Sequence, residues 1–168
     1  LLETIIGIQK IKSGRVVIGG KDVTALSPSL RNISYVPQDI CLFPHMKVID
    51  NIMYGVKVRK IDPAPLKPFI DELIEFLNIS AILERYPAGL SGGEKQRAAI
   101  VRALAARPDL MILDEPFSAI DSALREDARR LLKELSASHA ITSLIVTHDI
   151  DEAYFLADEI SVLISGSI

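Results

Sequence analysis

The stretch Leu110–Pro116, which reads LMILDEP, is the most informative part of this 168-residue sequence. Four apolar residues followed at once by two carboxylates and a proline predict a short buried strand that ends in an acidic turn. Open α/β sheets bind their ligands at the carboxyl ends of the strands. Asp114 is therefore a candidate Mg²⁺ ligand, and Glu115 is a candidate acceptor that polarises an attacking water. Acidic pairs also end strands in proteins where they have no such role.

A second stretch, Leu90–Arg97, reads LSGGEKQR and predicts the start of a helix. Ser91 and Glu94 have the spacing of a capping box, which is the ordinary interpretation of this segment. A capping box does not explain Gly92 and Gly93, because each costs about 1 kcal/mol of helix propensity relative to alanine. Bare N–H groups at the positive end of a helix can approach an anion closely, and the Ser91 hydroxyl adds a donor. The segment therefore predicts a phosphate-binding helix start.

Three other polar residues follow predicted strands or precede a predicted helix. Gln38 comes two residues after the strand 33–36, and its amide oxygen is a candidate ligand of Mg²⁺ and sensor of a terminal phosphate. His148 comes after the strand 143–146 and is a candidate donor to a phosphate oxygen. Asp121 lies directly before a charged helix. We expect His148 at the same sheet edge as the two carboxylates, and Gln38 at the end of another strand.

Each of these residues also has an ordinary interpretation. Gln38 and His148 can be turn residues, and Asp121 can be a helix cap. Asp149 and Glu152 have the spacing of the N-cap and third residue of the helix that follows. No single residue decides between the two interpretations, and the functional one depends on the order of all of them.

The pattern along the whole chain predicts an α/β fold. The predicted strands include 15–18, 33–36, 110–113, 143–146 and 160–164; the predicted helices are the end of one at 1–8 and those at 48–54, 67–77, 91–107, 122–135 and 150–157. Gly19 and Gly20 mark a turn. Apolar strands that alternate with helices indicate a parallel sheet covered on both faces. We expect residues 1–38 and 108–168 to form this core and residues 39–107 to form a helical insert.

Composition excludes several classes of protein. The 19 basic and 22 acidic residues are interleaved and leave a net charge of −3, which disfavours a nucleic-acid-binding surface. No apolar run approaches the roughly 18 residues of a membrane-spanning helix, and no secretory leader is recognisable. The single cysteine, Cys41, cannot form an internal disulfide and suits a reducing cytoplasm. We expect its side chain to be a half-buried apolar filler.

The residues named above occur in the order Gln38, Ser91–Gly93, Asp114–Glu115, Asp121 and His148. This order resembles that of the nucleotide-binding subunit of ATP-binding cassette (ABC) transporters, and the resemblance covers essentially the whole chain. By this resemblance Leu90–Arg97 is the family signature, Leu110–Pro116 the Walker B strand, and Ser118–Asp121 the D-loop. Gln38 matches the Q-loop glutamine and His148 the switch histidine. Ile120 stands where the family usually has leucine, which is a volume-conserving change.

The resemblance implies a P-loop NTPase of the RecA-like kind with a helical signature subdomain. It implies two cassettes packed head to tail, with ATP and Mg²⁺ between them. Ser91, Gly92 and Gly93 would then contact the ATP of the partner, and Asp121 of the D-loop would be a further nucleotide-binding residue. Gln38, Asp114, Glu115 and His148 would act on the ATP of their own subunit, with Asp114 and Gln38 on the metal. The implied location is the cytoplasmic face of a membrane, beside permease subunits and, indirectly, a solute-binding protein outside the cell.

One family feature is missing from the sequence. No G-x-x-x-x-G-K-[ST] loop occurs in the 168 residues, and the adenine-stacking aromatic residue that precedes it in the family is missing too. In the family that loop directly precedes a helix like the one at Leu1-Leu2, so the fold would be incomplete at its amino terminus. We expect the 168 residues alone to hydrolyse no ATP, although the full-length protein does.

The branch of the family is indicated by the insert. Gln38 and Ser91 are 53 positions apart (91 − 38), too few for the long insertions of chromosome-maintenance and DNA-repair relatives. Leu42–Met46, followed by Val48–Ile52, resembles importer cassettes, in which this region receives a helix of the permease. The pattern is most similar to the molybdate, tungstate and sulfate importers, with polyamine and sugar importers as alternatives. A DNA-maintenance ATPase and a regulatory cassette without turnover are two further hypotheses; Glu115 and His148 disfavour the latter.

Overall fold

A three-stranded parallel sheet forms the centre of the structure. The computed structural model describes residues 1–118, 120 and 122–168. Strands β3 (Ile33–Val36), β4 (Leu110–Asp114) and β5 (Ser143–Val146) lie in the order β3-β4-β5. Both pairings are parallel, so the carboxyl ends of all three strands reach the same edge of the sheet.

The central strand, β4, is the one that the run of apolar residues predicts. Met111, Ile112 and Leu113 are fully buried, and Leu113 lies opposite Val36 of β3 and Ile145 of β5. A strand that is buried on both faces reads as continuous apolar sequence, because neither face can carry polar side chains to water. The α/β expectation is therefore confirmed at its most informative point.

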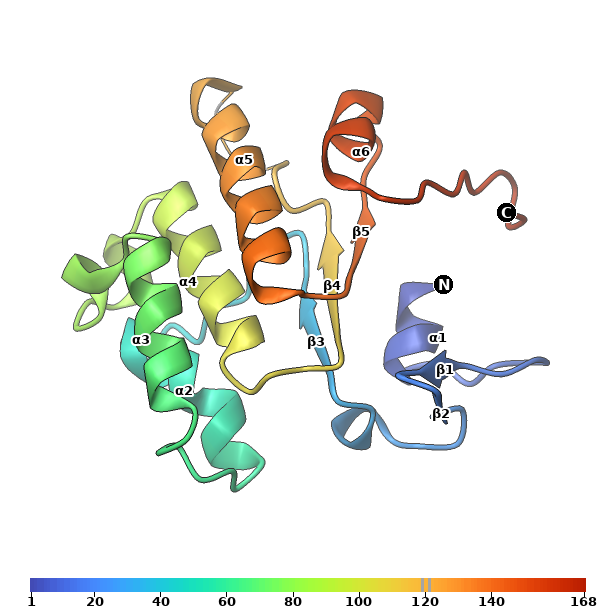
Figure 1. The fold of residues 1–168 in the computed structure, drawn as a ribbon, viewed down its shortest axis with the longest axis horizontal. Coiled ribbons are helices and arrows are strands. Elements are labelled where there is room, and N and C mark those ends of the chain that lie inside the picture. Colours follow the sequence, from blue (N-terminus) through green and yellow to red (C-terminus); the bar gives the residue numbers. More distant parts are fainter. Residues whose placement is uncertain (119, 121) are drawn as a thin grey trace.

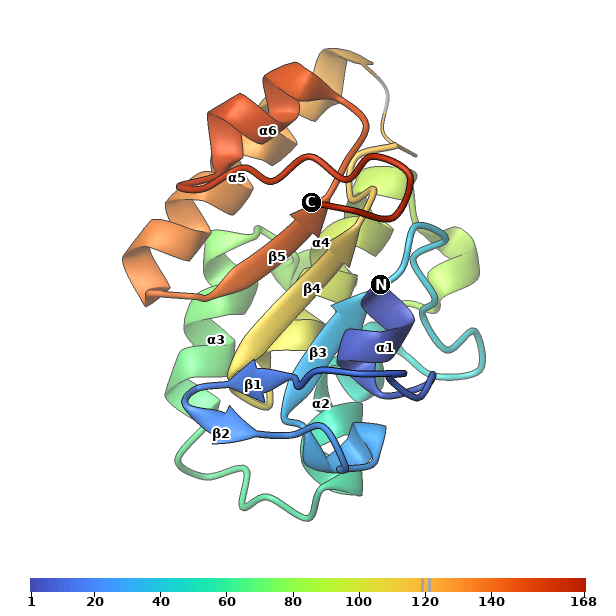
Figure 2. The same ribbon diagram turned by 90° about the vertical axis from the view of Figure 1, so that its right-hand side faces the viewer.

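Helices cover both faces of this sheet (Figures 1 and 2). Helices α2 (Val48–Val58), α3 (Lys67–Phe76) and α4 (Gly92–Leu104) form a layer behind the sheet in Figure 2, and α4 contacts β3 directly. Helices α5 (Ser122–His139) and α6 (Ile150–Leu156) pack against each other beside β5. The short 3₁₀ helices are Pro28–Leu30, Ser80–Ile82 and Pro87–Gly89.

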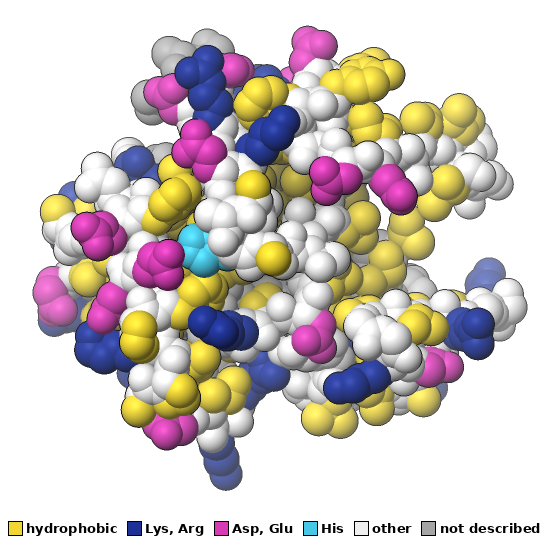
Figure 3. Space-filling view, viewed as in Figure 1, with side chains coloured by type: hydrophobic (Ala, Val, Ile, Leu, Met, Phe, Trp, Pro, Cys, Tyr) yellow, Lys and Arg dark blue, Asp and Glu magenta, His cyan; other side chains and the backbone are white. Residues whose placement is uncertain are grey.

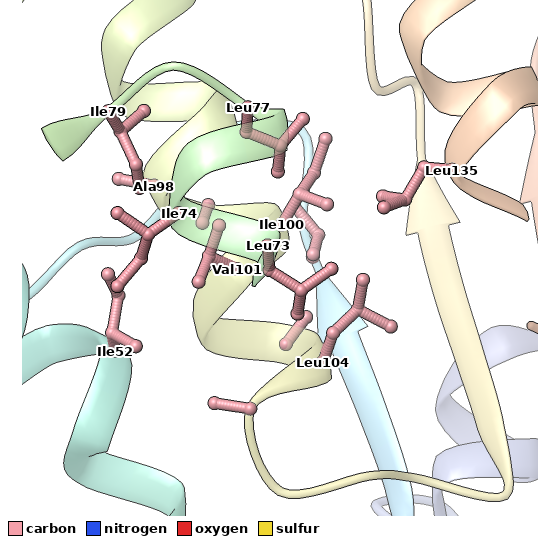
Figure 4. Close-up of a cluster of buried hydrophobic side chains, with 14 of the residues drawn as sticks. Ile52, Leu73, Ile74, Leu77, Ile79, Ala98, Ile100, Val101, Leu104 and Leu135 are labelled. Carbon is pink, nitrogen blue, oxygen red and sulfur yellow. The ribbon is translucent and has the colours of Figure 1, made fainter. Parts of the chain in front are cut away.

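Apolar burial holds the layer of α2, α3 and α4 together (Figure 4). Ile52, Leu73 and Val101 are fully buried at the contact between the three helices. Ala98 and Ala99 are also fully buried, and their small side chains let α4 lie close to its neighbours. Each buried aliphatic side chain contributes about 1.5–3 kcal/mol relative to its exposed state. The helical segment expected between Gln38 and β4 is present, and its division from the core as a separate subdomain stays a prediction.

The amino-terminal segment lies on the opposite face of the sheet (Figure 2). Helix α1 (Leu2–Ile6) ends at Gly7 in the left-handed conformation. The buried Arg31 guanidinium donates hydrogen bonds to four backbone carbonyls, those of Thr4, Ile5, Thr24 and Leu26. A Cβ at position 7 would lie 2.5 Å from the Arg31 Nε atom, so glycine is required there by both backbone and packing.

A two-stranded antiparallel hairpin follows α1. Strands β1 (Val17–Ile18) and β2 (Lys21–Asp22) are joined by Gly19 and Gly20, whose φ angles are 55° and 76°. Positive φ at both central residues defines a type I′ turn, which matches the twist of a hairpin and favours glycine. The turn predicted from Gly19 and Gly20 is confirmed.

The strand expected at 160–164 is wrong. Ile164 forms one isolated bridge with Ser167, and the side chains of Val162 and Ile164 are 65% and 69% exposed. Figure 3 shows hydrophobic side chains gathered along this carboxyl-terminal segment and in the hollow between it and α1. Alternating β-branched residues favour an extended conformation, but a strand needs a neighbour for its N–H and C=O groups. In the described part of the chain β5 pairs with β4 alone, and no strand lies beside residues 160–164.

Cys41 is exposed rather than half-buried, so that expectation is also wrong. It lies in the irregular segment between β3 and α2, where its carbonyl accepts a hydrogen bond from Arg102 and its side chain faces solvent. Among the residues that the structure describes, no helix is both long enough and apolar enough to cross a bilayer.

Candidate functional site

Three of the predicted polar segments meet at one edge of the sheet. Gln38 lies in the turn after β3, Asp114 and Glu115 end β4, and His148 follows β5. This convergence results from the parallel pairing, because each strand delivers its carboxyl end to the same side. We call Asp114, Glu115 and His148 the sheet-edge cluster.

Glu115 and His148 are in direct contact. His148 Nδ1 lies 2.6 Å from Glu115 Oε1, although the two residues are 33 positions apart. The Glu115 side chain is 19% exposed and the His148 side chain 81% exposed. The hydrogen bond to the Glu115 carboxylate, reinforced by its charge, raises the pKa of His148 above its ordinary value. The pair can therefore hold a proton between imidazole and carboxylate at the mouth of the site.

The backbone of Glu115 is in an unusual conformation. Its φ angle is 49°, a region that costs a residue with a side chain about 1–2 kcal/mol. The strand ladder holds it from one side, since Glu115 N donates to the Val146 carbonyl at 2.9 Å. From the other side Ser118 Oγ donates to the Glu115 carbonyl at 2.9 Å, and Gln96 Nε2 of α4 donates to the Pro116 carbonyl. Strain maintained by several independent contacts is common at functional sites.

Asp114 is held by a tyrosine of the neighbouring strand. The Tyr35 hydroxyl donates to Asp114 Oδ2 at 3.0 Å. Burial and this hydrogen bond raise the pKa of Tyr35 to about 12. Asp114 Oδ1 accepts no hydrogen bond from the residues that the structure describes, and the Gln38 side chain is exposed. Mg²⁺ in phosphate-transfer sites takes one or two protein oxygens beside phosphate and water, so this donor set fits the metal.

Helix α4 begins with the predicted capping box. Glu94 N donates to Ser91 Oγ at 3.3 Å, and Ser91 N donates to Glu94 Oε2 at 2.7 Å. The Ser91 N–H bond holds the pKa of Glu94 below its ordinary value. A Cβ at Gly93 would meet nothing within 4 Å. Gly93 is helical, so neither backbone conformation nor packing within this chain requires a glycine there.

No hydrogen bond or ion pair joins the helix start to the sheet-edge cluster within the part of the chain that the structure describes. A cavity of about 190 Å³ lies between α4 and α5, lined by Ser91, Gly93, Gln96 and Phe117 among others. Among the described residues the Ser91 hydroxyl has one hydrogen bond, from Glu94 N within its own capping box. Asp121 lies outside the described residues, so its expected role has no structural test. The roles of all the site residues remain predictions.

Two residues near the site were not found from the sequence. Tyr35 is one of four residues in a short apolar strand, and only a hydroxyl at its end distinguishes it from a core aromatic. Gln96 lies within the stretch Leu90–Arg97, but the sequence alone gives it no role. The signal in both cases is a polar group on a predicted strand or helix that also carries buried residues, since a polar group close to the core needs a partner.

The sequence of this chain matches that of a known family. The model of the ABC transporter family matches residues 1–118. The chain therefore belongs to the ABC transporter family.

Individual relatives are similar over all 168 residues. The sulfate/thiosulfate import ATP-binding protein CysA of Nocardia farcinica is 44% identical. The molybdate/tungstate import ATP-binding proteins WtpC of Thermococcus kodakarensis and Pyrococcus horikoshii are 45% and 42% identical. The chain covers 51%, 51% and 49% of these three proteins, about half the length of the curated relatives it matches.

The fold is also that of a solved structure. A dimeric ATP-binding cassette in a post-hydrolysis state, bound to ADP and Pi, aligns with a TM-score of 0.75 and 29% identity. The alignment covers 92% of this chain and 71% of that chain. The parallel α/β fold is therefore that of an ABC ATPase, a P-loop NTPase.

Proposed function

We propose that this chain is part of the ATP-hydrolysing subunit of an importer, and that two copies enclose ATP between them. One ATP site would combine the sheet-edge cluster of one copy with the α4 start of the other. The observation that carries the proposal is a pair of features: acidic and imidazole groups converge at one edge of the sheet, while the glycine helix start has open space over Gly93 and no hydrogen bond to those groups within the same chain.

The sheet-edge cluster would act on the nucleotide of its own subunit. Asp114 and Gln38 would hold Mg²⁺, which neutralises developing phosphate charge when bound. Glu115 would accept a hydrogen bond from the attacking water and orient it. His148 would donate to a terminal phosphate oxygen, and its raised pKa favours the protonated ring that such a donor requires. Catalysis of this kind depends on positioning and electrostatics rather than on a covalent step.

The start of α4 would serve the partner. Ser91 offers a hydroxyl, and Gly92 and Gly93 offer backbone N–H groups at the positive end of a 13-residue helix. Because a Cβ at Gly93 would meet nothing in this chain, the contact that requires glycine would come from outside it. Asp121 would belong to the same interface.

A hollow beside α2 would receive the permease. His45, Met46, Tyr54 and Tyr86 are among the residues that line this hollow of about 350 Å³.

Asn51 holds the loop that forms one wall of the hollow. It is fully buried, accepts a hydrogen bond from Phe43 N at 2.7 Å, and donates to the carbonyls of Phe43, Met46 and Lys47. A loop held this firmly is a suitable surface for a helix of a membrane partner.

The transported substrate would be an inorganic oxyanion such as molybdate or tungstate. This rests on the names of the relatives, which import sulfate and thiosulfate or molybdate and tungstate. The subunit would lie at the cytoplasmic face of the membrane as a homodimer, with a solute-binding protein on the other side. The 168 residues alone would hydrolyse no ATP, because the phosphate loop is missing from their sequence.

The test is ATP turnover by the full-length protein and by three variants. Glu115→Gln keeps the shape of the side chain and removes its charge, and we expect turnover to fall on the order of 100-fold. His148→Ala should give a loss of similar size. Glu159→Gln, an exposed glutamate away from the site, is the matched control and should leave turnover unchanged. Turnover that survives in both Glu115→Gln and His148→Ala would contradict the proposed function.

A further inference from the structure

The exposure of His148 raises the question of what holds it in place. Its side chain is 81% exposed, so packing against the core does not position the ring. The hydrogen bond recorded for the ring within the described residues is the one to Glu115. A single contact cannot orient an exposed side chain whose backbone is free. The position of the ring must therefore depend on how firmly its two sequence neighbours are held.

Both neighbours are held by one hydrogen-bonded network. Thr147 Oγ1 accepts from Asp149 N at 3.0 Å and donates to Glu152 Oε2 at 2.7 Å. Asp149 Oδ1 in turn accepts from Glu152 N at 3.1 Å, as the N-cap of α6. The residues before and after His148 are thus tied to each other and to the first turn of α6.

An arginine of α5 joins this network through its charge. Arg129 Nη2 lies 2.5 Å from Asp149 Oδ2 and 3.9 Å from Glu152 Oε2, so one nitrogen lies near two carboxylates. The Arg129 side chain is 12% exposed and the Glu152 side chain 5% exposed. Arg129 therefore fastens the segment around His148 to α5, a helix on a different part of the chain.

The burial of Glu152 is not explained by the cap alone. Asp149 already satisfies the cap, and Glu152 Oε1 is buried without a hydrogen-bond partner. Burial raises the pKa of Glu152, which indicates that the surroundings disfavour its charge. A carboxylate that is expensive to bury and only partly satisfied is expected where its remaining contact, to Thr147, has a use.

We propose that Glu152 and Arg129 are positioning residues that hold the backbone of His148 so that its ring reaches Glu115 at the sheet edge. The inference rests on the proposed role of His148 in ATP hydrolysis. Neither residue touches the reacting atoms. Glu152 acts through Thr147, and Arg129 acts through Asp149 and Glu152.

The first experiment is a double-mutant cycle in the full-length protein. Glu152→Ala should lower kcat on the order of tenfold or more and leave the KM for ATP unchanged, because a displaced catalytic group reduces turnover without loss of binding. In the His148→Ala background the same substitution should have no further effect, since the residue it positions is gone. Asp151→Ala, an exposed residue of the same helical turn, is the matched control and should match the wild type. If the losses of kcat in the two single variants multiply in the double variant, the inference is overturned.

The second experiment does not depend on activity. In nucleotide-free full-length protein the ring of His148 should give a nuclear Overhauser contact with the side chain of Glu115. This contact should disappear in Glu152→Ala and remain in Asp151→Ala. Thr147→Val replaces the hydroxyl group with a methyl group and should likewise abolish the contact. It keeps the inference testable if Glu152→Ala does not fold.

The two experiments separate the inference from the proposed function. A wild type that hydrolyses no ATP would refute the proposed function, while the nuclear Overhauser contact would still test the positions. A contact that persists in both Glu152→Ala and Thr147→Val would overturn the inference, whatever the turnover.

Discussion

The helical layer of α2, α3 and α4 and the sheet-edge cluster are held by different forces. Ile52, Leu73 and Val101 are fully buried, and each is positioned by apolar contact on all sides. His148 is mostly exposed and depends on hydrogen bonds and charges of its neighbours. We therefore expect the helical layer to contribute more to the stability of the fold than the exposed His148 side chain does.

The largest effect is expected from the loss of a fully buried apolar side chain. Leu113→Ala removes a fully buried side chain from the central strand and should lower the free energy of unfolding by about 3 kcal/mol. The measurement is urea denaturation of the chain followed by circular dichroism. Leu163→Ala is the matched control, because Leu163 is 54% exposed, and should change stability by less than about 0.5 kcal/mol. Equal losses in the two variants would contradict the assignment of the core.

The next largest loss of stability is expected from the removal of a buried polar side chain. Arg31→Ala leaves the carbonyls of Thr4, Ile5, Thr24 and Leu26 without their shared donor, and should cost about 2–3 kcal/mol. Hydrogen exchange should show loss of protection in α1 before the rest of the chain. Arg59→Ala, an exposed arginine at the end of α2, should be close to neutral. If Arg31→Ala leaves the stability unchanged, α1 is held by other contacts.

A glycine substitution should separate stability from function. Gly93→Ala should stabilise the fold by about 0.5 kcal/mol, because a Cβ there meets nothing and alanine is the better helix former. In the full-length protein the same substitution should reduce ATP turnover strongly. Gly55→Ala is the matched control in α2, where a Cβ would make an ordinary contact at 3.7 Å with Ala106, and should leave turnover unchanged. Unchanged turnover in Gly93→Ala would remove the case for a phosphate contact.

The smallest effect is expected on the pH dependence of the free energy of unfolding. Contact with Glu115 raises the pKa of His148 in the folded state above its ordinary value of 6.5. Its contribution to stability should therefore be complete below pH 6.5 and should be lost as pH rises through the folded-state pKa. His148→Gln should abolish this part of the pH dependence of unfolding, whereas His45→Gln, at an exposed residue, should not. A dependence of opposite sign would indicate that the ring is bound in its neutral form.

The elements that local pattern determines could be predicted from the sequence. The apolar run before Asp114 predicted β4, and Ser91 with Glu94 predicted the capping box, because each signal lies within a few residues. The turn at Gly19 and Gly20 was found for the same reason. Tertiary partners were harder to predict. The prediction of a strand at 160–164 was wrong because a β-forming pattern does not supply a neighbouring strand.

The site was predictable as a location and not as a set of contacts. Parallel strand order placed Glu115 and His148 at one edge, and their 2.6 Å contact followed only from the structure. The bond from Tyr35 to Asp114 joins residues 79 positions apart and left no local signal. Side-chain orientation depends on packing around each residue, which one sequence does not contain.

Mixing two inactive variants tests the shared site most directly. In the full-length protein, Glu115→Gln disables the sheet-edge cluster and Ser91→Arg blocks the start of α4, and each variant alone should lose nearly all ATP turnover. A mixed dimer of the two would combine both defects in one site and leave the other site intact, so ATP turnover should return on mixing. Mixed dimers that form and stay inactive would mean that Ser91 and Glu115 of one chain serve the same nucleotide, contrary to a site divided between two subunits.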